Sequence, residues 1–150
     1  MNKDILIVDD EEDIRQLIAG ILQDEGFNTR LAWDYNSIKQ EISKRIPALV
    51  LLDVWLENSN LDGIEILKLI KKSYPDLPII MISGHGTIQM AINSLKVGAF
   101  NFIEKPFDTN LLLLNINRAI DNAELKKKVN QFTDDDVKFI GESSSALLVK

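Results

Sequence analysis

The chain has 150 residues, 45% of them hydrophobic and 27% charged, with a formal net charge of −6 and no cysteine. These values are typical of one globular domain with a hydrophobic core, and they exclude disulfides and thiol catalysis. The acidic balance argues against nucleic-acid binding by this segment. Without a signal peptide or a long apolar run, a cytoplasmic protein with no membrane contact is expected.

Short apolar runs alternate with segments of helical periodicity along the chain. The runs predict five strands, at residues 4–8, 28–33, 48–52, 78–82 and 100–104. A helix is predicted after each strand, because apolar residues recur there at intervals of three and four. Strict alternation of this kind indicates βαβ units. We therefore predict an α/β fold with a five-stranded parallel doubly wound sheet and helices on both faces.

Local signals mark several helix boundaries. The second helix is expected to run through Ile46 and to stop before Pro47, because helical backbone is disfavoured just before a proline. Asp62 and Glu65 have the spacing of a capping box, which would open the third helix. A long fifth helix is expected to end near residue 132, before an acidic break at Asp134–Asp136.

Residues that can carry chemistry stand at the ends of the predicted strands: Asp9, Asp10, Asp53, Ser83 and Lys105. All strands of a parallel sheet end at the same edge, so these side chains should converge on one site. Three carboxylates and one ammonium in a single crevice suggest a divalent cation, such as Mg²⁺, and a phosphate, because unpaired carboxylates repel one another. Taken singly, each acid is explained equally well as a residue that caps the following helix. That explanation is poor for Asp53, which lies well before the next predicted helix.

The chain resembles the receiver domains of two-component response regulators in four segments: IVDDEEDIR, LVLLDVWL, IIMISGHG and FNFIEKPF. The similarity extends over about residues 3–121. It implies a flavodoxin-like sheet with the strand order 2-1-3-4-5. It also implies a switch controlled by phosphorylation, which catalyses its own phosphotransfer and dephosphorylation and is otherwise not an enzyme.

The resemblance implies a role for each acidic residue at the strand ends. Asp53 matches the aspartate that accepts a phosphoryl group from a sensor histidine kinase, as a 4-aspartylphosphate. Asp9 and Asp10 match the acids that bind Mg²⁺, and the remaining metal ligands would be Asp53 and the backbone carbonyl of Trp55. Neutralising the charges of nucleophile and phosphate together is what phosphoryl transfer requires.

The other matched residues would sense the phosphoryl group. Ser83 matches the hydroxyl that contacts phosphoryl oxygens, and Lys105 matches the lysine that pairs with them. Ser83 and Phe102 would form the switch that alters the surface of the fourth helix, fifth strand and fifth helix. His85 and Trp55 are expected to flank the phosphoryl group and tune the approach of water. The alternative for His85 is a solvent-exposed residue in a glycine-flanked loop.

Two positions depart from most receivers. Gly63 lies farther beyond Asp53 than the family's glycine usually does, and the intervening VWLENSNLDG lacks the usual proline. That longer loop resembles the NtrX-like branch of the NtrC family. Phe102 stands where many members have tyrosine, so its ring lacks the hydroxyl that would stabilise an inward rotamer.

The end of the chain resembles a different kind of domain. FIGESSSALL is similar to the segment that opens the ATPase domain of sigma-54-dependent activators. We therefore expect a receiver domain at 1–122, a helical linker at 123–138 and the truncated start of a sigma-54-type AAA+ ATPase domain at 139–150. No GxxxxGK[ST] phosphate loop occurs, so these residues cannot hydrolyse ATP. Binding of DNA and sigma-54 RNA polymerase would belong to domains absent from this chain.

Two other functions compete with the phosphorylated switch. A phosphatase with an aspartyl nucleophile usually needs a second acid two residues later, where this chain has Trp55. A receiver-like domain that no longer accepts phosphate would have lost acidic residues that are all present here. A homodimer is also expected, because Leu125, Val129 and Phe132 continue the apolar spacing of the fifth helix. The alternative there is a solvated linker helix.

Overall fold

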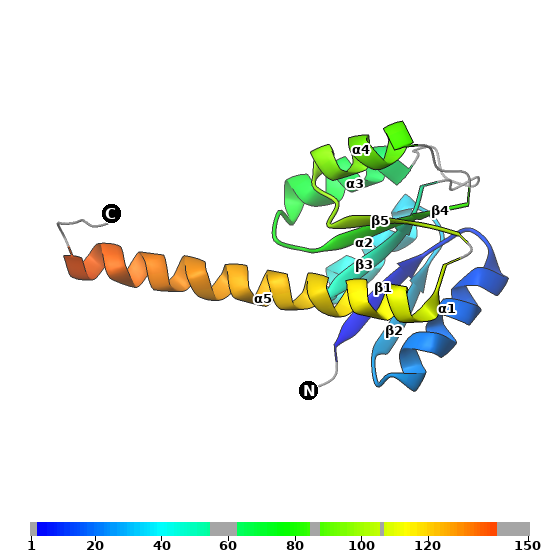
Figure 1. Ribbon diagram of the computed structural model, residues 1–150, viewed down its shortest axis with the longest axis horizontal. Helices are drawn as coiled ribbons and strands as arrows, with labels where there is room; N and C mark the ends of the chain where they lie inside the picture. Colours follow the sequence, from blue (N-terminus) through cyan, green and yellow to red (C-terminus); the bar gives the residue numbers. More distant parts are fainter. Residues whose placement is uncertain (1–2, 55–62, 85–87, 106, 141–150) are drawn as a thin grey trace.

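Five parallel strands form one twisted sheet in the computed structural model, which describes residues 3–54, 63–84, 88–105 and 107–140, with only the backbone at 127–140. The strands are β1 (Asp4–Val8), β2 (Asn28–Ala32), β3 (Leu49–Asp53), β4 (Ile79–Ser83) and β5 (Asn101–Glu104). Their order is β2-β1-β3-β4-β5 (Figure 1). The predicted fold class and the strand order implied by the resemblance are both confirmed.

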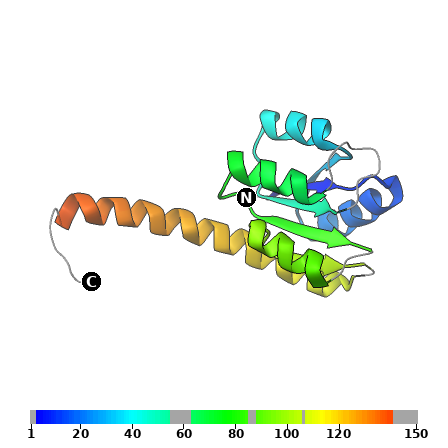
Figure 2. The same cartoon turned by 90° about the horizontal axis from the view of Figure 1, so that it is seen from above.

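Helices cover both faces of this sheet. They are α1 (Glu12–Asp24), α2 (Tyr35–Lys44), α3 (Gly63–Ser73), α4 (Ile88–Val97) and α5 (Thr109–Ile140). One face packs against α1 and α5, and the other packs against α2, α3 and α4 (Figures 1 and 2). No helix in the described ranges is both long and apolar enough to cross a membrane.

The central strand β3 contributes to both halves of the core. Val50 and Leu52 pack in the cluster under α2 and α3, whereas Leu49 and Leu51 pack in the cluster under α1 and α5. All four side chains are fully buried. A parallel strand covered on both faces must be apolar along its length. Asp53, the last residue of β3, is therefore the first polar side chain where the strand reaches the sheet edge.

The helix α2 ends at Lys44, so the prediction that it runs through Ile46 is wrong. Arg45 already has extended backbone, and this conformation brings its guanidinium within 2.8 Å of the Asp4 carboxylate. Pro47 also disfavours helical backbone at Ile46, whose side chain is largely exposed. A contact distant in sequence and the proline together end this helix early.

The helix α5 begins after Asp108, whose carboxylate accepts a hydrogen bond of 3.0 Å from the backbone amide of Asn110. It continues to Ile140, so the expected acidic break at Asp134–Asp136 is wrong. No glycine or proline occurs between Thr109 and Ile140. Aspartate lowers helix propensity by only about 0.7 kcal/mol relative to alanine. Three aspartates therefore weaken this helix without ending it.

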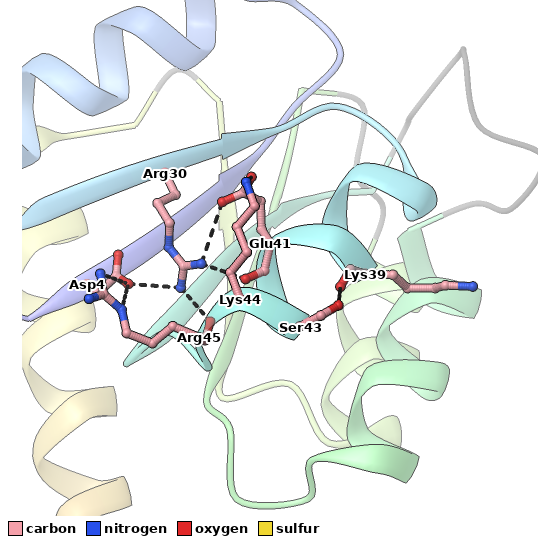
Figure 3. A network of polar contacts seen from close by, with 7 residues as sticks. All are labelled: Asp4, Arg30, Lys39, Glu41, Ser43, Lys44 and Arg45. Carbon is pink, nitrogen blue, oxygen red and sulfur yellow. Dashed lines mark hydrogen bonds and ion pairs between the residues drawn. The ribbon is translucent and has the colours of Figure 1, made fainter.

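A partly buried ion network anchors the amino-terminal edge of the sheet (Figure 3). The Asp4 carboxylate of β1 lies 2.8 Å from Arg30 of β2 and 2.8 Å from Arg45, which follows α2. Arg30 also donates hydrogen bonds to the carbonyl oxygens of Glu41 (2.6 Å) and Arg45 (2.7 Å). These carbonyls lie at the end of α2, where helical carbonyls otherwise lack partners. The network thus fastens α2 to the first two strands.

We expect Asp4→Asn to destabilise the protein by about 2 kcal/mol, a typical value for losing hydrogen bonds between charged groups. The neutral amide would leave two neighbouring guanidinium groups without their counter-charge, and Arg30 is mostly buried. Urea unfolding would measure the change. Lys44→Met is the control, because it removes only an exposed ion pair to Glu41 and should cost less than about 0.5 kcal/mol. Equal unfolding midpoints for the two variants would contradict the structural role of Asp4.

Candidate metal and phosphoacceptor site

Four strands deliver the candidate residues to one edge of the sheet. Asp9 follows β1, Asp53 ends β3, Ser83 ends β4, and Lys105 follows β5. The carboxyl ends of all four strands lie on the same side of the molecule (Figure 1). Residues spread over most of the sequence therefore meet because the strands are parallel.

The acidic side chains and the lysine lie in direct contact. The Lys105 ammonium is 2.9 Å from Asp9 Oδ2 and 3.4 Å from Asp53 Oδ2. Asp9, Asp10 and Asp53 each place a carboxylate oxygen within 4.8 Å of the others. Asp9 and Asp53 are only 2% and 5% exposed. Carboxylates so close together and so buried need positive charge nearby, which Lys105 supplies in part.

Asp9 shapes the turn between β1 and α1 as well as the site. Its Oδ1 accepts a hydrogen bond of 2.9 Å from the backbone amide of Glu11, while its Oδ2 faces Lys105. Its own backbone amide donates to the carbonyl of Ala32 over 3.2 Å. The bond from Glu11 closes the turn before α1 and does not cap the helix, whose N-cap is Glu11 without a capping side chain, so the helix-cap explanation is wrong for Asp9.

The Lys105 side chain is kept charged by the two carboxylates. Burial is the largest single influence and by itself would lower the pKa of Lys105, but hydrogen bonding to Asp9 and the charges of Asp53 and Asp9 outweigh it and raise the pKa. A raised pKa in the folded state means that the stabilisation from this ammonium is complete at neutral pH. It is lost only as the pH rises above the ordinary lysine value of about 10.4.

Ser83 is fully buried and lies beside Lys105. The two strands β4 and β5 pair Ser83 with Glu104, and the Lys105 backbone amide donates a hydrogen bond of 2.8 Å to the Ser83 carbonyl. The residue before it, Ile82, pairs with Asp53 on β3. Ser83 is therefore one position beyond the level of Asp53, toward the edge where the acids meet.

Phe102 lies apart from the acidic cluster. On β5 it pairs with Met81 of β4, and it packs, half-buried, against the core on the side of α4. A cavity of about 620 Å³ adjoins its ring, lined also by Ile88, Ala91 and Leu111. Trp55, His85 and the Asp62 end of the expected capping box are outside the described residues.

Two more residues contact the site, of which the sequence singled out only Gly63, for its distance beyond Asp53. Arg15 of α1 donates a hydrogen bond of 2.6 Å to the backbone carbonyl of Asp9. Gly63 approaches the end of β3 so closely that a Cβ atom would lie 2.6 Å from the carbonyl oxygen of Asp53. Arg15 stands within the IVDDEEDIR segment, but nothing in the segment indicates that its side chain binds a carbonyl.

The three carboxylates fit a hard divalent cation. Mg²⁺ prefers oxygen ligands, commonly binds through one or two carboxylates and keeps several waters. Asp9, Asp10 and Asp53 provide such oxygens at a spacing that one ion can bridge. Asp9 and Asp53 also contact Lys105, so a phosphate at this edge would meet both an ammonium and the metal site.

Comparison with known proteins identifies the family. The profile of the response regulator receiver domain matches residues 5–117. The chain belongs to this family. The receiver domain is 48% identical over 131 residues to the nitrogen assimilation regulatory protein NtrX of Azorhizobium caulinodans, which covers 87% of this chain and 29% of that protein. The expected likeness to the NtrX-like branch is confirmed.

Solved structures agree with this assignment. The receiver domain of NtrX from Brucella abortus has a TM-score of 0.76 and 53% identity, covering 79% of this chain and 98% of that chain. A beryllofluoride-activated NtrC4 receiver domain dimer has a TM-score of 0.75 and 34% identity, covering 80% and 98%. The present chain spans about a third or less of the curated NtrX relatives, at 29% and 31% of their lengths for the first two.

Proposed function

We propose that this receiver domain accepts a phosphoryl group on Asp53 from a sensor histidine kinase, in the presence of Mg²⁺, and relays that event to a transcription regulator. The observation that carries the proposal is the contact of one ammonium, Lys105, with two buried carboxylates, Asp9 and Asp53. A structural ion pair needs only one carboxylate. The additional acid Asp10 within 4.8 Å is what a metal site requires.

The chemistry follows from the positions of these groups. A carboxylate oxygen of Asp53 forms a bond to phosphorus as the bond from phosphorus to the histidine nitrogen breaks, and that nitrogen keeps the electron pair. Mg²⁺ held by Asp9, Asp10, Asp53 and the Trp55 carbonyl would neutralise charge on the phosphoryl oxygens. As Asp53 attacks, the Lys105 ammonium gives up its contact with the Asp53 carboxylate. It then pairs with the phosphoryl group, whose negative charge replaces that of the carboxylate. Hydrolysis by water would reverse the modification, with Trp55 and His85 affecting its rate.

The switch would use Ser83 and Phe102. Phosphate capture would draw the Ser83 hydroxyl toward Asp53, and the Phe102 ring would turn into the space that opens. The cavity of about 620 Å³ beside Phe102 leaves room for ring motion at the contact of α4, β5 and α5. Ile88 on α4 is 82% exposed at this surface. Phosphorylation would bias a pre-existing equilibrium between two arrangements of this surface.

The downstream partner is inferred from the relatives. NtrX and NtrC relatives are regulators about three times the length of this chain. We assign 1–122 to the receiver, 123–138 to a helical linker and 139–150 to the start of a sigma-54-type AAA+ ATPase domain. In the whole protein, absent domains would bind DNA and sigma-54 RNA polymerase in the cytoplasm. The linker assignment agrees with the continuation of α5 to Ile140.

Incubation with acetyl phosphate tests this function. With Mg²⁺, we expect a stable adduct of one phosphoryl group per chain in intact-mass spectra, and removal of the metal with EDTA should prevent it. Continuous release of phosphate without an adduct would instead indicate a phosphatase. No reaction in either condition would indicate a domain that only binds partners, and would contradict the proposal.

Dimerisation through α5 is a separate expectation. Leu111, Leu114 and Leu125 are exposed on this helix, and a helix in a protein gains most of its stability by packing its apolar face against a partner. Ending the chain after Asp121 should therefore shift the mass measured by light scattering toward monomer. The same measurement on the 150-residue chain is the reference. An unchanged mass would show that the linker does not contribute to a dimer interface.

A further inference from the structure

Arg15 contacts the candidate metal site without belonging to it. Its Nη1 donates a hydrogen bond of 2.6 Å to the backbone carbonyl oxygen of Asp9. Its guanidinium carbon lies 5.8 Å from the centroid of the Trp33 ring, within the range of a cation–π interaction. The side chain is thus held between an aromatic ring on one side and the turn after β1 on the other.

The carbonyl that Arg15 holds belongs to the peptide bond between Asp9 and Asp10. A peptide unit is planar, so fixing this oxygen also fixes the backbone nitrogen and Cα of Asp10. The Asp9 side chain is held independently, by the Glu11 amide at 2.9 Å and by Lys105 at 2.9 Å. The contact with Arg15 therefore orients the part of the turn that carries Asp10.

Trp33 supports Arg15 from a firmly anchored backbone. It follows β2, and its amide donates a hydrogen bond of 2.9 Å to the hydroxyl of Ser37. Ser37 and Asp34 form the capping box of α2, in which each side chain accepts a hydrogen bond from the backbone of the other. The Trp33 side chain itself is 48% exposed, so packing in the core does not explain its position.

We propose that Arg15, supported by Trp33, is a positioning residue for the metal site. It orients the peptide between Asp9 and Asp10 and so places the Asp10 carboxylate against Asp53. This inference rests on the proposed function, because it takes these carboxylates as the Mg²⁺ ligands.

Because Arg15 is positively charged, the direction of the change in Mg²⁺ affinity after its removal tests the proposal. Removing a cation near a metal site should strengthen Mg²⁺ binding if only Coulomb forces change. Losing the orientation of Asp10 should weaken it, typically about tenfold when a residue that holds a metal ligand is removed. Weaker Mg²⁺ binding in a variant that lacks the charge of Arg15 would therefore show that Arg15 orients Asp10.

Calorimetric titration of the whole chain with Mg²⁺ alone measures this difference. We expect Arg15→Met to raise the Kd about tenfold and Trp33→Ala to raise it by a smaller factor. Arg15→Lys keeps the charge but lacks the planar guanidinium, so it should restore part of the affinity. Arg118→Met is the matched control, because it removes the same charge from an exposed position on α5 and should leave the Kd unchanged.

Two further measurements separate the possible failures. Thermal unfolding in EDTA establishes that each variant is folded, and the amide NMR signal of Asp10 in the metal-free protein should shift in Arg15→Met but not in Arg118→Met. If folded Arg15→Met and Trp33→Ala bind Mg²⁺ as tightly as the wild-type protein or more tightly, the positioning role of Arg15 is wrong, while the proposed function stands. A wild-type protein that binds no Mg²⁺ and forms no adduct overturns the proposed function, and this inference with it.

Discussion

Asp53→Asn is expected to abolish phosphoryl incorporation from acetyl phosphate and from a phosphorylated histidine kinase. The amide has no charged oxygen to attack phosphorus, although its size and shape match those of the carboxylate. The variant should stay folded, because Lys105 keeps its contact of 2.9 Å with Asp9. Intact-mass spectra after incubation with Mg²⁺ and the donor would measure the modification.

A control with the same chemical change makes this result specific. Asp13→Asn replaces an exposed aspartate in the first turn of α1 and should leave phosphorylation unchanged. If the Asp53 variant were modified as fast as the wild-type protein, another residue would have to be the acceptor and the assignment of Asp53 would be wrong.

Gly63→Ala is expected to produce the largest loss of stability, about 3 kcal/mol or more, because it overpacks a site that cannot give way. The added Cβ would lie 2.6 Å from the Asp53 carbonyl oxygen, 2.6 Å from Val54 Cα and 2.8 Å from the Val54 carbonyl oxygen. All of these are backbone atoms, so no side chain can rotate aside. The Gly63 amide also donates a hydrogen bond of 2.8 Å to Val54. Urea unfolding and the rate of adduct formation should both show the effect, since the end of β3 carries Asp53.

Gly20→Ala gives the opposite expectation for the same chemical change. Gly20 lies in α1, and a Cβ there would meet nothing within 4 Å. Alanine in an exposed helix is more stable than glycine by about 0.5–1 kcal/mol. A similar loss of stability in both variants would show that the approach of Gly63 to β3 is not the cause.

The convergence of the site could be predicted from the sequence because it depends on topology alone. Once the strands are parallel, the residues that follow their apolar runs must share an edge. Asp9, Asp53 and Lys105 meet there in the structure at hydrogen-bonding distances. Their phosphoryl and metal roles remain predictions, since they depend on ligands and not on the fold.

Contacts between distant side chains and backbone groups could not be predicted in this way. The early end of α2 depends on Arg45 reaching Asp4, a residue 41 positions away. The hydrogen bond from Arg15 depends on the direction of one carbonyl group in a turn. Neither periodicity nor composition encodes such directions, because many side-chain conformations are compatible with the same helix pattern.

The continuous helix α5 would enlarge a small tilt at the sheet into a larger displacement at its far end. Its first part packs on the sheet beside the candidate site, and the Lys3 ammonium of the opposite edge still contacts Glu124 at 3.0 Å. Beyond residue 120 the same helix extends roughly 30 Å away from the domain, at about 1.5 Å per residue (Figures 1 and 2). Each degree of tilt where α5 meets the sheet would then displace the far end by about half an ångström. A rearrangement too small to disturb the core would reach whatever follows Ile140 as a displacement of several ångströms.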